Sequence, residues 1–226
     1  MNNPGETNPF DANQEKDMNP EREKLREVGE RSKQFVVISG PSGSGKTMVI
    51  KHLVENYGFV EPPFLTTRPL RPGEDEIGGV SLIQEEFTRR KAEDKIFLPA
   101  RNYGNAYGYN LDIIFTIAVE GNNIVVEAPA SNLVSDVSHL LPESTVIGML
   151  PLGRQELEAQ LIQRGLNNDE DRRVRLEGAE TEKEQIIQAS ALMKISQIVP
   201  VHGVPQDTIS QIDKLMEEKG FKKISK

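Results

Sequence analysis

A glycine-rich octapeptide between an apolar run and a helix-like run carries the residue types that bind phosphate. It reads Gly40-Pro41-Ser42-Gly43-Ser44-Gly45-Lys46-Thr47, which fits the phosphate-loop pattern of a glycine, four free positions and Gly-Lys-Thr. Its glycines permit backbone conformations that a Cβ disfavours, so successive N–H groups can turn toward one anion at the start of the next helix. We therefore expect a cradle for a nucleotide's terminal phosphates; the alternative is a plain glycine-rich turn.

Two side chains at the end of this loop have the chemistry for a nucleotide bound with magnesium. Lys46 would place a positive charge on the β- and γ-phosphates, and the hydroxyl of Thr47 would ligate Mg²⁺. The sequence thus predicts ATP and Mg²⁺ as cofactors. The residues expected to bind the nucleotide phosphates are Gly40, Ser42, Gly43, Ser44, Gly45, Lys46 and Thr47.

A second basic segment follows the loop at residues 66–74, Thr-Thr-Arg-Pro-Leu-Arg-Pro-Gly-Glu. Its prolines exclude a continuous helix, so Arg68 and Arg71 are expected on a constrained, extended turn. Two guanidinium groups so placed suit a bidentate grip on a phosphate. A solvated basic turn is the alternative interpretation.

Two more polar residues are candidates for contact with a substrate. Glu127 ends the apolar run 123–127, and the carboxyl ends of strands border the ligand crevice of an open α/β sheet. It is therefore a candidate for contact with substrate or magnesium. Residues 102–109 form a glycine-punctuated stretch with three tyrosines, which we expect to be a loop. Its tyrosines either pack or present a phenol to a phosphate or a ring.

Four arginines cluster on a predicted helix-loop-helix at residues 154–193. They are Arg164, Arg172, Arg173 and Arg175. One interpretation is a solvated face that is balanced by nearby acidic residues. The other is a lid that brings arginine onto a transferring phosphoryl group.

Alternating apolar strands and helices predict an α/β core with a parallel sheet. Expected strands lie at 34–39, 59–60, 96–98, 123–127, 144–150 and 197–202. Expected helices lie at 46–56, 84–94, 111–120, 154–164, 170–193 and 210–220. Residues 1–33 are nearly devoid of large apolar side chains, and we expect disorder up to residue 18 and a short charged helix from Pro20. A solvated lead-in is favoured there over a partner-binding helix.

Composition excludes several kinds of chemistry. The 226 residues carry a net charge of −8 and no obvious basic stripe, so no nucleic-acid partner is expected. The chain has no cysteine, and its three histidines lack the spacing of metal ligands. No apolar run is long enough to cross a membrane and no targeting segment is recognisable, so a cytoplasmic location is expected. Nothing in the sequence indicates an oligomeric state.

Over residues 34 to about 218, the order of these parts resembles the guanylate kinase family. The stretch 38–47 matches the family's phosphate loop, and 66–74 resembles its monophosphate-binding segment, with Arg68 and Arg71 at the two arginine positions. Residues 104–108 match its Gly-Asn-any-Tyr-Gly segment, which gives Tyr107 the role of a phosphate-contacting tyrosine. The triplets 163–165 and 174–176 resemble two lid pieces and imply catalytic roles for Arg164 and Arg175.

Several positions that bind guanine in the family differ here. Phe64 stands at a serine position, Leu98 at the base-reading glutamate, and Pro129 at the second strand-end acid. The second tyrosine of the acceptor segment is absent from residues 79–82, and Gln160 stands at a lid arginine. The phosphate-facing groups persist while base-reading groups are lost. Because unpaired or missing hydrogen-bond partners change discrimination strongly, selectivity for guanine is expected to be altered.

The resemblance implies a P-loop kinase fold with a parallel-sheet core, helices on both faces, a small acceptor-binding subdomain and a helical lid. The expected divisions are an extension at 1–33 and a kinase-like domain at 34–222, with an acceptor-binding insertion at about 64–110 and a lid at about 154–176. The implied activity is ATP-dependent phosphoryl transfer to a nucleoside monophosphate, with Lys46, Arg164 and Arg175 catalytic and Arg68, Arg71, Tyr107 and Glu127 holding the substrate. The alternatives are a guanylate kinase-like interaction module, or a kinase of a sugar phosphate or a modified nucleotide.

Overall fold

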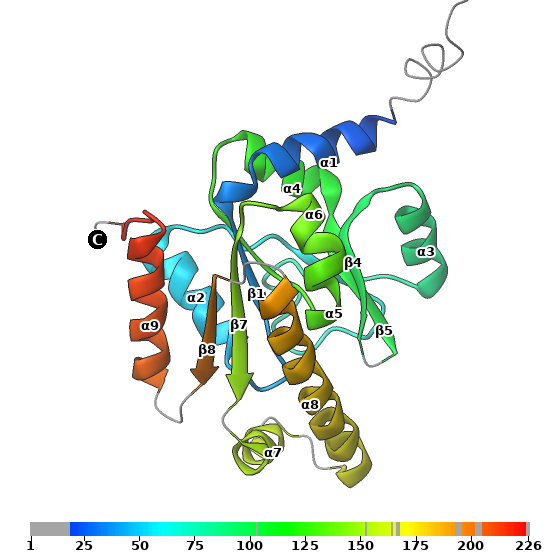
Figure 1. Ribbon diagram of the computed structural model, residues 1–226. Helices are drawn as coiled ribbons and strands as arrows, with labels where there is room; N and C mark the ends of the chain where they lie inside the picture. The colour runs from blue at the N-terminus through cyan, green and yellow to red at the C-terminus, as the bar shows by residue number, and fades with distance from the viewer. Residues whose placement is uncertain are drawn as a thin grey trace, which may run out of the picture.

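A parallel β-sheet holds the phosphate loop at the end of one of its inner strands. The structure is a computed structural model that describes residues 19–102, 104–151, 153–163, 165, 168–192, 196–201 and 205–224. Within these ranges a parallel sheet has the strand order β6 (Ile124–Glu127), β1 (Phe35–Ser39), β7 (Thr145–Pro151) and β8 (Gln197–Val201) (Figure 1). Strand β1 is buried along its whole length, as expected for a parallel sheet that is covered on both faces.

Alternate residues of β1 divide the core into two layers. Val36 and Ile38 pack in one cluster with apolar residues of α2 (Lys46–Tyr57) and α9 (Pro205–Glu218). Phe35 and Val37 pack in the other, with residues of α4 (Leu111–Val119) and α8 (Asp169–Leu192). Helices therefore cover both faces of the sheet (Figure 1), which confirms the expected α/β fold class.

A second, mixed sheet extends from the core. Its strand order is β3 (Val80–Ser81), β2 (Phe64–Thr66), β5 (Asn105–Asn110) and β4 (Ile96–Asn102), and α3 (Gln84–Ala92) packs on it through Phe87. The expectation of a loop at 102–109 was wrong, because β4 and β5 form a hairpin there. Position 108 of β5 is occupied by glycine because a Cβ there would come within 2.4 Å of the Ile96 side chain. The glycine reflects close packing between strands and not a loop.

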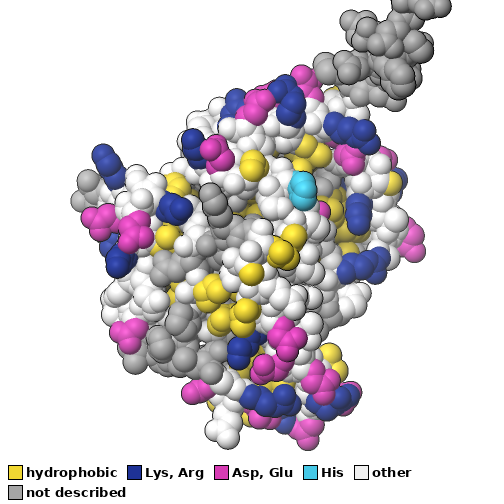
Figure 2. Space-filling model, in the orientation of Figure 1, with side chains coloured by type: hydrophobic (Ala, Val, Ile, Leu, Met, Phe, Trp, Pro, Cys, Tyr) yellow, Lys and Arg dark blue, Asp and Glu magenta, His cyan; other side chains and the backbone are white. Residues whose placement is uncertain are grey.

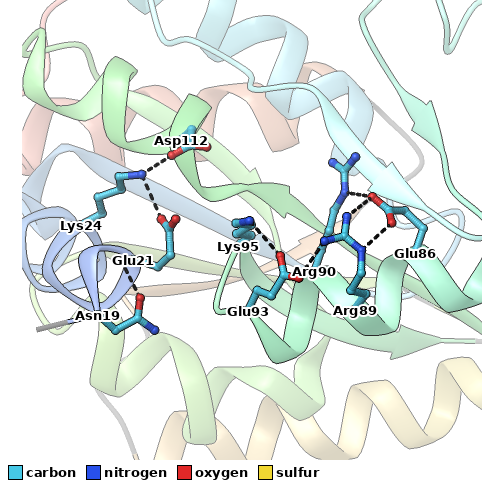
Figure 3. Close-up of polar contacts among 9 residues, drawn as sticks. All are labelled: Asn19, Glu21, Lys24, Glu86, Arg89, Arg90, Glu93, Lys95 and Asp112. Atoms are coloured by element: carbon cyan, nitrogen blue, oxygen red, sulfur yellow. Dashed lines mark hydrogen bonds and ion pairs between the residues drawn. The ribbon is translucent and has the colours of Figure 1, made fainter. Parts of the chain in front are cut away.

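The N-terminal helix α1 (Pro20–Glu30) packs on the domain. Asn19 caps it by accepting a hydrogen bond from the N–H of Glu21. Val28 is 1% exposed and belongs to the same core cluster as α4. Lys24 of α1 contacts Glu21 and, across the interface, Asp112 of α4 (Figure 3). The interpretation of this helix as a solvated lead-in was therefore wrong; residues 1–18, where we expected disorder, lie outside the described part of the chain.

The remaining connections complete the core and the helical hairpin. Between β6 and β7 run the short turns α5 (Ala130–Asn132), η2 (Leu133–Val137) and α6 (Ser138–Leu140), which the sequence did not reveal, and η1 (Ser32–Gln34) precedes β1. Helix α7 (Arg154–Gln163) packs against α8 through the cluster Leu157, Leu161, Leu176 and Ala179. The expected strand at 59–60 was wrong, because it is reduced to a single bridge between Val60 and Ile124.

Charged side chains of both signs are mixed over the visible face of the molecule. Figure 2 shows them side by side along α1 and at the outer end of α8, where Arg173 pairs with Glu170 and Glu177. The outer surface of α3 is similar, with Arg89 paired to Glu86 and Glu93 (Figure 3). In the described part of the chain, no helix is both long enough and apolar enough to span a membrane.

Candidate active site

The phosphate loop has the conformation of an anion cradle. Gly43 and Gly45 have φ angles of +94° and +84°, which side chains rarely adopt. A Cβ on Gly40 would come within 2.6 Å of the carbonyl oxygen of Met149, so the loop passes too close to β7 for any side chain there. Gly45 is the N-cap of α2 and offers no side-chain cap, which leaves the first turn of the helix suited to an external anion.

Lys46 lies folded over this loop. Its Nζ atom donates to the carbonyl oxygens of Gly40 at 2.8 Å and Pro41 at 3.2 Å. The same atom lies 3.7 Å from Oε2 of Glu127, which ends β6 next to β1. The parallel pairing of β1 and β6 thus brings a lysine and a carboxylate, 81 residues apart in sequence, to the same edge of the sheet.

The loop fits a nucleotide's phosphates and Mg²⁺ by its donor chemistry. The Oγ atom of Ser44 is fully buried in the cradle and has no hydrogen-bond partner among the described residues. A buried hydroxyl without a partner is costly, so it favours a bound polar group at this position. Thr47, the expected magnesium ligand, is exposed at the start of α2. Within the described ranges, no cluster of acidic or histidine side chains would hold a metal without the nucleotide.

The proline-flanked turn presents its arginines in different ways. The guanidinium group of Arg68 makes a two-pronged ion pair with Glu74, with distances of 2.7 and 2.6 Å. Glu74 also accepts from the backbone N–H of Arg71, so one carboxylate holds the whole turn. The bond from Arg68 keeps the pKa of Glu74 below its ordinary value. Sequence reasoning missed this role of Glu74, although its place at the end of the arginine segment was a usable signal.

Arg71 is exposed on this turn, and Tyr107 is half-buried in β5. Partial desolvation lowers the pKa of Arg71, and the nearby positive charges of Arg68 and Arg175 lower it further. Tyr107 of β5 stands opposite Thr66 of β2 in the sheet register. The pKa of Arg68 is raised mainly by Glu74, with a smaller contribution from the hydroxyl of Tyr107. Arg71 therefore lies within electrostatic range of Arg68, Tyr107 and Arg175.

The arginine cluster of the helical hairpin divides into two groups. The Nη1 atom of Arg175 donates to Oγ of Ser42 in the phosphate loop at 3.2 Å. Arg173 instead forms exposed ion pairs with glutamates of its own helix, which agrees with the interpretation as a solvated face. Arg172 pairs with an aspartate one helical turn away. Arg164 lies outside the described residues. Arg175 therefore joins α8 to the phosphate loop.

The tyrosines of the β4–β5 hairpin also have separate roles. Tyr109 is buried, and its hydroxyl accepts from the N–H of Glu127 at 2.8 Å and donates to the carbonyl of the same residue at 3.2 Å. It therefore fixes the backbone that carries Glu127, a packing role. Tyr107 is half-buried and lies beside Arg68. Tyr103 lies outside the described residues.

Apolar side chains occupy two positions that the sequence analysis associated with base reading. Leu98 is 2% exposed, packs in the main core and has a φ of +47° at a register shift of β4. A leucine in this backbone region is strained, and such strain persists where the surrounding structure enforces it. Phe64 is half-buried, and the guanidinium carbon of Arg68 lies 6.0 Å from the centre of its ring.

A phosphate loop between an inner parallel strand and its helix, in contact with a helical hairpin through Arg175, defines a P-loop kinase-like fold. The guanylate kinase family model matches residues 32–200. The guanylate kinase of Clostridium perfringens is 34% identical over 64% of this chain and 68% of its own length. That of Thermotoga maritima is 31% identical over 66% and 72%.

A crystal structure of guanylate kinase from Anaplasma phagocytophilum shares the fold, with a TM-score of 0.60 and 20% identity over 82% of this chain and 85% of that one. The chain belongs to the guanylate kinase family. Membership of this family makes it a nucleoside monophosphate kinase that uses ATP.

Proposed function

We propose that this kinase transfers the γ-phosphoryl group of ATP to a nucleoside monophosphate. We also propose that its selectivity for guanine in that acceptor is weaker than the name of its relatives, guanylate kinase, implies. The observation that carries the proposal is the contact of Arg175 with Ser42, together with the closeness of Arg71 to Arg175. The contact joins the phosphate loop to α8, and the turn that carries Arg71 lies within electrostatic range of Arg175. Such an arrangement suits two phosphate groups that must meet in line.

The proposed roles follow from the charge and position of each group. The cradle of residues 40–47, with Lys46, binds the β- and γ-phosphates, and Thr47 holds a Mg²⁺ ion that would neutralise charge on them. Arg68, Arg71 and Tyr107 hold the acceptor phosphate on an insertion at about 64–110. Glu127 contacts the substrate next to Lys46. Arg175, with Arg164, closes a lid at about 154–176.

This arrangement needs no general base. An oxygen of the acceptor phosphate is already anionic and attacks the γ-phosphorus, while the bond from that phosphorus to the β,γ-bridging oxygen breaks and leaves ADP. Catalysis then consists of positioning two anions and balancing their charge. Arg175 of α8 donates a hydrogen bond to Ser42 of the phosphate loop, and this position supports a role in balancing charge on the transferring group.

The altered selectivity for the base rests on Leu98 and Phe64. Both are apolar side chains at positions where the family resemblance places polar readers, and Leu98 is buried in the core. Neither can accept a hydrogen bond from the ring N–H or the amino group of guanine. Since a site that hydrogen-bonds its substrate rejects analogues by about 10⁴-fold or more, loss of those groups should leave much weaker discrimination.

An ADP-release assay with ATP, Mg²⁺ and a panel of monophosphates tests the proposal. We expect turnover of GMP, with kcat/KM for IMP and AMP within about 100-fold of it, given the limited discrimination of apolar contacts. Lys46→Ala should abolish the signal, whereas Lys51→Ala, on the exposed side of the same helix, should leave it unchanged. A kcat/KM for GMP more than about 10⁴-fold above that for IMP and AMP would contradict the proposal of weaker base selection, but not the proposal of phosphoryl transfer. A signal that survives Lys46→Ala, or no turnover and no affinity for ATP in the natural chain, would contradict the transferase itself.

A further inference from the structure

A buried carboxylate on α8 has none of the roles assigned above. Glu182 is 9% exposed, and its Oε1 atom accepts a hydrogen bond from Nδ2 of Asn102, in β4, at 3.1 Å. Its Oε2 atom is buried and has no hydrogen-bond partner within the described part of the chain. A half-satisfied buried carboxylate reduces stability compared with an apolar side chain of similar size. Packing alone therefore does not explain a glutamate at this position.

Glu182 lies within the electrostatic reach of the phosphate loop. Burial raises the pKa of its carboxyl group, and the positive charge of Lys46 opposes that rise. The hydrogen bond from Asn102 also opposes it, whereas the carboxylate of Glu127 adds to it. The charged and polar groups around Glu182 are thus those of the candidate active site and of β4.

The position of Glu182 along α8 links two parts of that site. It follows Arg175 by seven residues, which is about two helical turns, so both side chains lie on the same face of the helix. Near its N-terminal end this face contacts Ser42 of the phosphate loop, and two turns later it contacts Asn102 of the β4–β5 hairpin. Tyr107 stands in the same hairpin, paired with Ala100.

We propose that Glu182 is a positioning residue that ties the β4–β5 hairpin to helix α8 through Asn102 and so sets the separation between Tyr107 and Arg175. This role rests on the proposed phosphoryl transfer, in which those two side chains face the acceptor and the transferring phosphate. Because α8 also contacts the phosphate loop, the tie fixes the acceptor side of the site relative to the donor side. A misplacement of about 1 Å between reacting groups can cost about 100-fold in rate.

The test compares four variants of the full chain in the coupled assay. Glu182→Ala and Asn102→Ala each remove the tie, and both should lower kcat/KM for the monophosphate by about tenfold or more while the Kd for ATP stays within about threefold. Glu182→Gln keeps an oxygen that accepts from Asn102 and should retain most of the activity. The double variant Asn102→Ala/Glu182→Ala should be no worse than either single variant, because both singles remove one interaction.

Glu184→Ala is the matched control, since Glu184 is an exposed glutamate two residues after Glu182 on the same helix. It should behave like the natural chain. The proposal is overturned if Glu182→Ala keeps full activity, if Glu182→Gln is as impaired as Glu182→Ala, or if the two alanine effects multiply. Should Glu182→Ala fail to fold, Asn102→Ala in a half-exposed position supplies the same comparison with Glu182→Gln.

Hydrogen exchange separates this inference from the proposed function because it needs no turnover. Exchange in peptides covering 96–110 should be faster in Glu182→Ala than in the natural chain or in Glu182→Gln, since the hairpin loses its anchor. Unchanged exchange would reject the tie even if the enzyme is active. Faster exchange in Glu182→Ala, together with a natural chain that phosphorylates no monophosphate, would leave the tie in place and reject the transferase.

Discussion

Nη1 of Arg175 lies 3.2 Å from Oγ of Ser42, across 133 residues of sequence. This hydrogen bond joins α8 to the phosphate loop, and it distinguishes Arg175 from Arg173, two residues earlier on the same helix. The side chain of Arg173 points to glutamates of α8 and is exposed. A difference of two residues changes the helix face by about 200°, which is why one arginine meets the loop and the other meets solvent.

The first prediction concerns this pair of arginines. Arg175→Ala should lower kcat by about 100-fold or more, because a guanidinium group that balances charge on a transferring phosphoryl group contributes at least that much. Steady-state kinetics with saturating ATP measure it. Arg173→Ala should leave kcat within about twofold, since an exposed ion pair contributes little. Equal losses in the two variants would contradict the assignment of Arg175.

The second prediction concerns Glu74, which holds Arg68 in a two-pronged ion pair and accepts from the N–H of Arg71. Glu74→Gln should raise the KM for the monophosphate by about tenfold, because truncation of a charged, hydrogen-bonded partner costs about 1.4 kcal/mol or more. The Kd for ATP, from calorimetry, should not change. Arg68→Ala should act in the same direction. An effect of either variant confined to ATP would show that the turn does not serve the acceptor.

The third prediction concerns the N-terminal helix. Val28→Ala should lower the free energy of unfolding by about 2 kcal/mol, the typical cost of removing buried methyl groups from a packed core. Denaturant titration followed by circular dichroism measures this change. Glu23→Ala, on the exposed face of α1, is the control and should change stability by less than about 0.5 kcal/mol. Equal stability of Val28→Ala and the natural chain would mean that α1 is not part of the folded core.

The fourth prediction concerns pH and the joint between α2 and α9. Burial pushes the pKa of Asp213 upward, but hydrogen bonds from Lys223, His52 and Tyr57 outweigh it and hold the pKa below its ordinary value. The stability that this carboxylate supplies is therefore fully present above a pH of about 4 and is lost as pH falls through the lowered pKa.

Asp213→Asn should lower the Tm at pH 7 and flatten its decline between about pH 5 and pH 2, where the carboxylate would otherwise take up a proton. Thermal melts over that range provide the measurement. Asp207→Asn, near the exposed start of the same helix, is the control. A natural chain and an Asp213→Asn variant with parallel profiles would show that Asp213 does not carry this dependence.

Local patterns in the sequence were enough to predict the core. The phosphate loop, β1 and α2 follow from glycines, a lysine and an apolar run that are contiguous in the chain. The hairpin of β4 and β5 was missed because Gly104 and Gly108 read as loop signals. Only the packing of Ile96 against Gly108 explains the second one. The docking of α1 was missed because a single residue, Val28, carries most of its burial.

The site was predictable where residues follow directly from the ends of predicted strands, and not where the packing of a helix against a strand decides which side chains meet. Lys46 and Glu127 could be expected at one edge of the sheet, because one follows a predicted strand through the phosphate loop and the other ends a predicted strand. The bond between Asn102 and Glu182 spans 80 residues and joins two elements whose packing no periodicity reveals. Likewise, nothing in a run of arginines shows which one reaches Ser42, because that depends on the rotation of α8 about its axis.

The central claim is that the phosphate loop and the arginine turn serve one reaction site. The most direct measurement uses one probe in which adenosine and guanosine are joined through a chain of five phosphates, so that it can occupy a donor site and an acceptor site at once. Its binding to the protein is measured in competition with ATP and with GMP. The account predicts one molecule bound per chain, displaced by ATP and also by GMP, with affinity lost in both Lys46→Ala and Arg71→Ala. Displacement by ATP alone, with Arg71→Ala binding as tightly as the natural chain, would contradict it.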